Sequence, residues 1–576
     1  MEFFGDSMSS KFINFVSNIF KYKEKNTYNF VLPDADASQD STINDSNSLD
    51  SINSINKNLD KDINKNLEYI NSKYNTLINS DIKIREFVLT INNKQYKSFI
   101  FYIDGMIDTD IINRFVLNSL MLEDKSSILS PYTNKGNSHD NSKVEIKKNR
   151  EIDLVNYISN CLLPQNDVSK KSNFNDIFPS VNIGMTALFV DTIDVAFMID
   201  AKGFEKRSIV SPENEKIIRG SQESFIESIR TNTSLIRRLV NNENLIIESL
   251  SIGEINRNNC AICYVKNIAN DDLVAEVKYR LNNLDVDYVI SSGQLEQLIE
   301  DKNFSLPQLI STERPDKAAS YLLEGRVVII LNGTPYVLVA PAVFIDFLSS
   351  PEDKNLKFQF ADLLKIVRII AFIVTLLLPG LYIGITTFHE EIIPTELLFA
   401  ILASRNGVPF PIIFEILTME ISLELIRESG VRVPSPLGQT ISIVGALILG
   451  EAAVSAKIVS PLLVIVVAIT GITAFAVPDY SLSFHVRLAR FIYIILGYFA
   501  GFLGIAFGLT IHLAVMASIN SFGVSYLSPF APVFSSKETQ YFIEPIWKQE
   551  SRKGYISTKK NKKEEHISMK WKKGDV

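Results

Sequence analysis

The chain changes character once, near Leu363, from a largely polar sequence to one with the apolar composition of a membrane protein. Residues 369–388 (IIAFIVTLLLPGLYIGITTF) run for twenty positions without a charged side chain. A helix of about 20 residues is long enough to cross a hydrocarbon layer of about 30 Å. Further apolar stretches follow at 437–456, 458–477 and 491–516. We therefore predict a soluble N-terminal half of mixed α/β structure, followed by an all-α multispan membrane domain.

The composition argues against nucleic-acid binding and against catalysis. The formal net charge is −7, and the polar half carries no excess of basic residues to face a phosphate backbone. Cys260 and Cys263 form a C-x-x-C, but they lie in NCAICYVK, which is typical of a buried strand, and no second pair completes a zinc site. The sequence contains no phosphate-binding loop or nucleophile elbow. It therefore predicts no enzyme, no cofactor and no metal site.

The soluble half is predicted to begin with a flexible arm at residues 1–81. Residues 34–66 are dominated by Asn, Asp, Ser and Ile, and they offer too little apolar surface to offset the entropy of an ordered chain. A first α/β subdomain is expected at 82–205. It would contain a hairpin that starts near Ile82 and two strands within 187–203.

A second α/β subdomain is expected at 206–357. A strand at 260–265, a helix at 271–283 and a strand at 286–290 would follow in a βαβ-like order. Asn332-Gly333 separates two apolar runs, and this dipeptide supplies the positive φ angles of a type I′ hairpin turn.

The membrane domain is expected at 358–533, with four spans, re-entrant or interfacial segments, and up to six crossings in all. A basic tail follows at 534–576. Within it, residues 548–573 hold ten Lys and Arg against three Glu, which favours a cytoplasmic C-terminus. With a cytoplasmic N-terminal half, the number of crossings must be even.

Glu451 is a candidate for the lining or gating of an ion path. It stands between two apolar stretches, where an ionisable side chain usually faces a bundle interior or an aqueous cavity. The alternative is a local ion pair with Lys457, six residues further on.

Glu415, Glu420 and Glu424 form a second candidate group. Their spacing brings them to neighbouring faces of one helix, and rings of carboxylates favour cations over anions. The alternative is a solvated helix face on which Arg427 neutralises Glu424.

Gly497, Gly501, Gly504 and Gly508 recur at intervals of 4, 3 and 4 in the last long apolar stretch. This spacing predicts a smooth helix face on which another helix approaches closely.

Two basic positions in the soluble half could contact an anion. They are Arg237-Arg238 and Arg219-Gly220, for which solvated surface or a subunit contact is the alternative.

Several stretches resemble the A-subunit (GerA) family of bacterial spore-germination nutrient receptors. In the soluble half they are 206–239 (KRSIVSPENEKIIRGSQESF…) and 313–354 (ERPDKAASYLLEGRVVIILNG…); in the membrane half they are 387–411, 420–461 and 521–532. RGSQESF stands where the family pattern RGPREGF is expected, which puts an anion contact at this point in doubt.

The resemblance implies an A subunit that oligomerises in the spore inner membrane together with B and C subunits. It would form a nutrient-gated path for monovalent cations, in contact with membrane lipid. The alternatives are a nutrient-binding signalling receptor without a pore of its own, or a transporter-like permease. The soluble half and the tail would be cytoplasmic.

Overall fold

The computed structural model describes residues 30–33, 58–91, 94–121, 154–165, 167–203, 211–301, 305–432, 449–532, 545–546, 549 and 551–563. The chain divides into two units, residues 1–31 and residues 32–576, and every helix and strand among the described residues belongs to the second. Most of the predicted arm, and part of the apolar stretch at 437–456, lie outside the described residues.

The first subdomain is a five-stranded antiparallel sheet with the strand order β1-β2-β4-β5-β3. One apolar core packs the sheet against α3 and α7, and a second packs it against the helical segments at 109–121 and 154–162. Its elements in chain order are α3 (Ile63–Tyr74), β1 (Ile82–Ile91), β2 (Lys94–Ile103), α4 (Thr109–Ile111), a π-helical turn (Ile112–Leu117), α5 (Asn118–Met121), α6 (Leu154–Tyr157), a second π-helical turn (Ile158–Leu162), β3 (Val168–Lys171), α7 (Phe174–Asn182), β4 (Met185–Val190) and β5 (Ala196–Asp200).

The second subdomain is another five-stranded antiparallel sheet, with the order β6-β7-β9-β10-β8. Helices α8 and α11 share an apolar core with the sheet, and α9 and α10 also contact it. Its elements are α8 (Ile229–Leu239), β6 (Leu245–Ile252), β7 (Asn258–Val265), α9 (Asp271–Asn282), α10 (Ser292–Ile299), β8 (Ile310–Thr312), α11 (Pro315–Leu323), β9 (Val327–Leu331), β10 (Val337–Ala340) and α12 (Phe344–Phe347).

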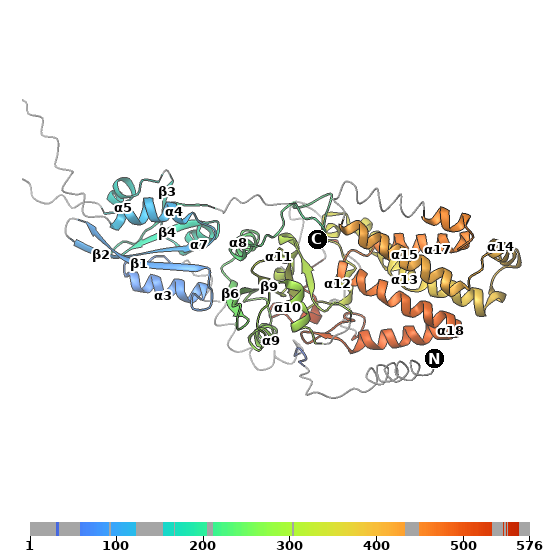
Figure 1. Ribbon diagram of the computed structural model, residues 1–576. Helices are drawn as coiled ribbons and strands as arrows, with labels where there is room; N and C mark the ends of the chain where they lie inside the picture. Colours follow the sequence, from blue (N-terminus) through green and yellow to red (C-terminus); the bar gives the residue numbers. More distant parts are fainter. Residues whose placement is uncertain are drawn as a thin grey trace, which may run out of the picture. The chain divides into compact units, whose positions relative to one another are not determined.

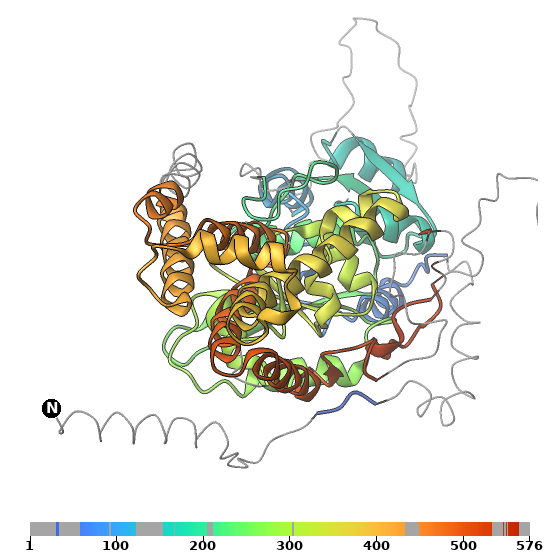
Figure 2. The same ribbon diagram turned by 90° about the vertical axis from the view of Figure 1, so that its right-hand side faces the viewer.

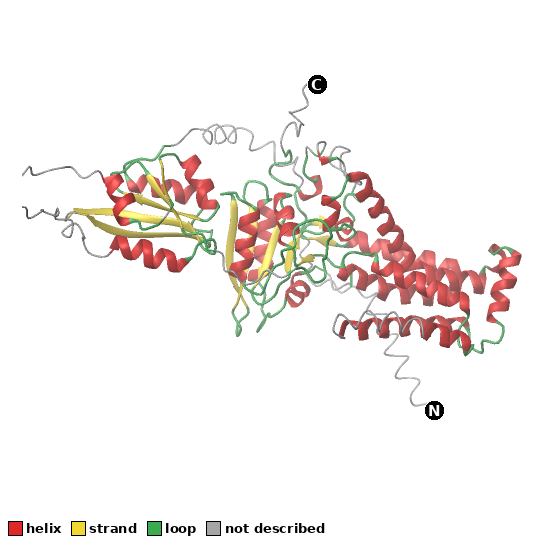
Figure 3. Ribbon diagram, turned by 90° about the horizontal axis from the view of Figure 1, so that it is seen from above, coloured by secondary structure: helices red, strands yellow, loops and turns green. Residues whose placement is uncertain are grey.

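The two subdomains repeat one arrangement. Each begins with a helix and two strands, continues through two helical segments, a strand and a helix, and ends with two strands. Numbered within its own sheet, each has the strand order 1-2-4-5-3. Figure 3 shows the strands of the two subdomains in separate sheets. The sequence shows no repeat that would predict this duplication.

Two expectations for the soluble half are corrected. Among the described residues, α3 at Ile63–Tyr74 already lies before residue 82, because Ile63, Ile70 and Tyr74 give it an apolar face that the sheet buries. The strand at 286–290 and its βαβ order are wrong. In this segment, Tyr288 forms an isolated bridge and no strand. The side chains of Tyr288 and Ile290 are exposed, so one face of the segment is not buried.

The C-terminal half is helical, as predicted. Helix α13 packs along α17 and α18 (Figures 1 and 2). The elements are α13 (Phe358–Phe388), α14 (Thr395–Arg405), α15 (Ile412–Arg432), a helical turn at 449–455, α17 (Pro461–Phe475), α18 (Tyr480–Ser518), and the two-residue strands β11 (Asn520–Ser521) and β12 (Val524–Ser525).

Helix α18 is bent back on itself at Gly501, so the single span predicted at 491–516 is interrupted. Gly501 has φ 55° and ψ −136°, which lie outside the helical region and suit a residue without a Cβ. The two halves then lie side by side, and His485 contacts His512. Figure 1 shows them as neighbouring helices joined at a bend.

Candidate functional site

A cluster of ion pairs joins α15 to the first half of α18. Nη2 of Arg490 lies 2.9 Å from Oε2 of Glu420 and 3.0 Å from Oε1 of Glu424. Arg487 lies 3.0 Å from Glu424, and Arg427 lies 3.4 Å from it. The side chains of Arg490 and Glu420 are fully buried. Both glutamates therefore have arginine partners, and the cluster is neither a solvated face nor a row of free carboxylates.

Glu415 belongs to a different set of contacts at the other end of α15. Its carboxylate lies 3.2 Å from Arg405 and accepts a hydrogen bond from the backbone N–H of Ser460 at 3.1 Å. Only 1% of Glu415 is exposed. The carboxylate therefore links α14 and α15 to the residue that precedes α17.

Glu451 stands apart from the other three glutamates. It lies on the helical turn at 449–455, and its side chain is exposed. Among the described residues, no ion pair joins it to Lys457; the Lys457 side chain lies instead beside Gly407. Of the four candidates, Glu451 is the one whose carboxylate points out of the described helices.

The four glycines serve two close contacts rather than one helix face. A Cβ at Gly497 would lie 2.5 Å from the carbonyl oxygen of Gly380 in α13. Gly501 forms the bend. A Cβ at Gly504 would lie 2.3 Å from the carbonyl oxygen of Leu496, and one at Gly508 would lie 2.5 Å from the Leu496 side chain. Gly504 and Gly508 thus face the first half of their own helix.

A hydrogen-bonded chain between the two halves of α18 was not predicted. Nε2 of His485 lies 3.2 Å from Nε2 of His512, whose Nδ1 lies 3.2 Å from the hydroxyl of Tyr493. The Ser305 hydroxyl lies 2.6 Å from Nδ1 of His485. Two histidines in an apolar stretch were the only signal in the sequence, and the bend that joins them was not foreseeable from their spacing.

The C-terminal tail segment, residues 551–563, docks on the second subdomain. Ile556 is fully buried, and Tyr555 nearly so. The Asn270 side chain donates a hydrogen bond to the carbonyl oxygen of Ser557 at 3.0 Å. The backbone N–H of Lys559 donates to the carbonyl oxygen of Ile268, also at 3.0 Å. The basic tail predicted from composition is therefore, over these residues, part of the folded subdomain.

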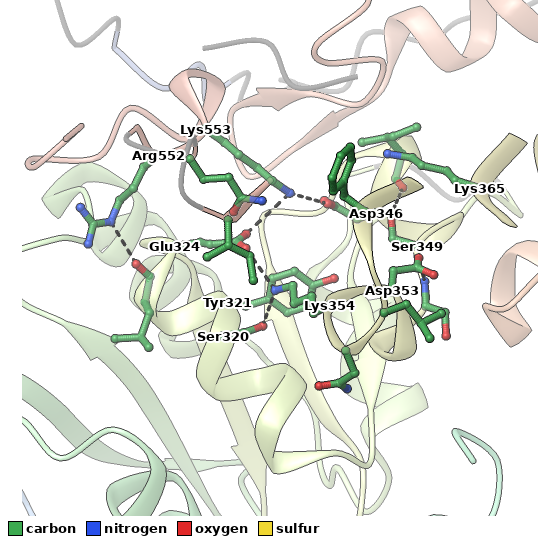
Figure 4. Close-up of a pocket in the computed structure, with 18 of the residues that line it drawn as sticks. Ser320, Tyr321, Glu324, Asp346, Ser349, Asp353, Lys354, Lys365, Arg552 and Lys553 are labelled. Atoms are coloured by element: carbon green, nitrogen blue, oxygen red, sulfur yellow. Dashed lines mark hydrogen bonds and ion pairs between the residues drawn. The ribbon is translucent and has the colours of Figure 1, made fainter. Parts of the chain in front are cut away.

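The docked tail places Lys553 between two carboxylates. Its Nζ lies 3.2 Å from Asp346 and 3.6 Å from Glu324 (Figure 4). Nη1 of Arg326 lies 2.7 Å from Asp346. Burial raises the pKa of Asp346, but Arg326 and Lys553 outweigh it and hold that pKa well below its ordinary value. Burial likewise raises the pKa of Glu324, but Lys553, Lys354 and Arg326 lower it to about 2.

These ion pairs predict an acid-sensitive subdomain. Because the folded pKa of Glu324 lies below the ordinary value of 4.5, its contribution to stability is present above pH 4.5 and is lost as the pH falls towards 2. That contribution is at most about 3 kcal/mol. We expect the melting temperature of the full chain in detergent to fall across this window, and to fall less steeply in Glu324→Gln.

The control for this titration is Glu68→Gln, which removes an exposed carboxylate from α3. It should keep the pH dependence of the wild type. Equal slopes for Glu324→Gln and the wild type would contradict the assignment to Glu324.

A large cavity lies beside these ion pairs. Its volume is about 1240 Å³, and its lining comes from the second subdomain, the start of α13 and the tail segment. Figure 4 shows Lys354, Lys365, Arg552 and Lys553 around it. The cavity was not predictable from the sequence because it is assembled from segments as distant as Arg219 and Lys563.

Comparison with known proteins identifies a family that matches most of this chain. The family of the Bacillus/Clostridium GerA spore germination protein matches residues 68–555. Spore germination protein KA of Bacillus subtilis (strain 168) is 38% identical over 481 residues, covering 83% of this chain and 84% of that protein. Spore germination protein GerLA of Bacillus cereus is 33% identical over 482 residues, covering 83% and 93% respectively.

A solved structure is also similar to part of the chain. The crystal structure of the N-terminal domain of the A subunit of the Bacillus megaterium spore germinant receptor GerK3 is 32% identical, with a TM-score of 0.37, and covers 50% of this chain and 98% of that one. The match over residues 68–555 and the two relatives, matched over 84% and 93% of their length, show that this chain belongs to the GerA family of spore germination proteins.

Proposed function

We propose that this chain is the A subunit of a spore germinant receptor. It assembles in the spore inner membrane with B and C subunits and with further copies of itself. Nutrient binding to the complex shifts the population of its helices towards an open arrangement that passes monovalent cations. Membership of the GerA family supports the role in germination.

The observation that carries the membrane part of the proposal is the apolar outer surface of the helical half. Among the described residues, α13 and α18 have the length and composition of membrane spans, yet only 39% and 33% of their most apolar windows are buried. Phe499, Leu503 and Phe507 are 74%, 80% and 65% exposed. A soluble monomer rarely leaves such a contiguous apolar surface in water, so lipid or other subunits are expected to cover it.

The contacts at the ends of α18 support an even number of crossings. His485, near its start, contacts Ser305 of the second subdomain, and Ser521, just after its end, donates to the carbonyl oxygen of Gln308. The bend at Gly501 lies instead beside His389, which follows α13. The helix thus leaves the subdomain and returns to it. With Lys553 also bound to Asp346, the soluble half and the tail belong on one side of the membrane, which we propose is the cytoplasm.

The glutamates divide into two proposed roles. Arginine partners make Glu420 and Glu424 poor ligands for a passing cation, and Glu415 is held by Arg405 and Ser460. These three would fix the helices to one another. Exposed Glu451 would line a path between copies of the chain, since an exposed carboxylate attracts cations.

The test is potassium release from liposomes that hold this chain with its B and C subunits, compared with liposomes that hold B and C alone. Mixtures of amino acids, sugars and nucleosides serve as candidate nutrients. We expect nutrient-dependent release that requires this chain. No release from an intact complex would favour a receptor that signals to a separate channel. Uptake of the nutrient itself would favour a permease.

A further inference from the structure

The cavity beside the docked tail carries a large excess of positive charge. Among the described residues that line it, eight are Lys or Arg, and three are carboxylates, those of Glu324, Asp346 and Asp353. All three carboxylates are already engaged. Asp346 pairs with Arg326 and Lys553, Glu324 with Lys354 and Lys553, and Asp353 with Arg368 at 2.6 Å.

The described carboxylates of the lining form no ion pair with four of its cations. Among the described residues, no ion pair involves Arg219, Lys357, Lys560 or Lys563. Burial lowers the pKa of Lys563, and the neighbouring cations Arg552, Lys354 and Lys553 lower it further against the opposing effect of Glu324. Like charges gathered around a hollow of about 1240 Å³ repel one another, and an anion inside it would relieve that repulsion.

The position of the cavity indicates which kind of anion it would bind. Lys357 and Phe358 stand at the start of α13, and the charge-free run of that helix begins at Ile369. Eleven residues of helix span about 16 Å. The lining also contains apolar side chains, Leu356, Phe358 and Ile546 among them. A basic cavity with apolar lining residues, located at the start of a membrane helix, is suited to an amphiphile with an anionic headgroup.

We propose that this cavity binds a phosphate-bearing anion, with the headgroup of an anionic membrane phospholipid as the source that its position favours. The inference depends on the proposed membrane location of α13. A headgroup bound there would contact the second subdomain, the first membrane helix and the tail segment together. It would thereby stabilise the docked tail through its contacts with Lys560 and Lys563.

The experiment uses the full-length chain in zwitterionic detergent. Native mass spectrometry measures the binding of dioleoyl phosphatidylglycerol and of dioleoyl phosphatidylcholine, which differ in the headgroup. We expect the phosphatidylglycerol to bind at least about tenfold more tightly, and Lys357→Gln/Lys560→Gln to lose most of that preference, since each lysine near a lipid surface contributes about fivefold.

The matched control is Lys83→Gln/Lys94→Gln, which removes two exposed lysines from β1 and β2 of the first subdomain. It should keep the full preference. Equal binding of the two lipids, or equal loss in both double variants, would overturn the proposal. Binding of glycerol 1-phosphate alone at least as tight as that of phosphatidylglycerol would support the anion site but overturn the lipid as its source. The measurement needs neither B and C subunits nor ion flux, so its failure and that of the proposed function are distinguishable.

Discussion

Gly497→Ala is expected to lower the stability of the helical half by about 2–3 kcal/mol, the upper part of the range for an added methyl group that the surroundings cannot accommodate. The new Cβ would lie 2.5 Å from the carbonyl oxygen of Gly380. That obstacle is backbone, and so it cannot rotate away as a side chain can. Helices α13 and α18 would have to separate along their shared face. Thermal unfolding of the full chain in detergent, followed by circular dichroism, measures the loss.

Gly450→Ala is the matched control for this substitution. Gly450 also lies in a helix, but a Cβ there would meet nothing nearer than a methyl carbon of Val464 at 3.5 Å, which is an ordinary contact. Alanine is a better helix former than glycine by about 1 kcal/mol, so this variant should be neutral or slightly more stable. The two substitutions should therefore have effects of opposite sign on the stability of the chain. Equal melting temperatures would show that α13 and α18 do not approach as closely as described.

Arg490→Met is expected to cost about 3–5 kcal/mol, because it leaves a buried carboxylate without its partner. Glu420 and Arg490 are both fully buried and lie 2.9 Å apart. In the variant, Glu420 would have to take up a proton or draw water into the helix interface. Either response should lower the melting temperature of the full chain by several degrees.

A second substitution separates the ion pair from general packing. Because replacing both partners with apolar residues removes the uncompensated charge, Arg490→Met/Glu420→Met should recover most of the loss. Arg487→Met removes an arginine that is 12% exposed and pairs with Glu424, which keeps Arg490 and Arg427 as partners, so a smaller effect is expected. If the double variant loses as much stability as the two single substitutions at Arg490 and Glu420 together, the two residues do not act as a pair.

The elements that were predictable from sequence depend on local chemistry. Asn332-Gly333 lies in the loop that joins β9 to β10, so the predicted hairpin is confirmed, and Gly333 has a positive φ. Asn332 does not, and the loop runs over residues 332–336, so the predicted type I′ turn is wrong. The C-x-x-C of β7 is buried core, as expected, with Cys260 and Cys263 fully buried. In each case the residues that decide the structure lie within a few positions of one another.

The remaining features depend on contacts between distant segments. Glycine spacing indicated close packing near Gly497, but it could not show that the chain turns back at Gly501, since the same residues suit a straight helix. The spacing of Glu420 and Glu424 gave no reason to choose Arg490 as their partner, 66 residues from Glu424. The docking of Lys553 on Asp346 spans 207 residues. Composition identifies such a tail as basic, and only the fold identifies what it contacts.

The most direct test of the proposed cation path is the rate of nutrient-dependent potassium release from liposomes that hold the complex with Glu451→Gln. Removal of an exposed carboxylate from a cation path should slow release by about tenfold, while the complex stays intact on size-exclusion chromatography. Glu396→Gln, which removes an exposed carboxylate from α14, should release potassium as the wild type does. Release at the wild-type rate from Glu451→Gln would contradict a path that runs past this residue.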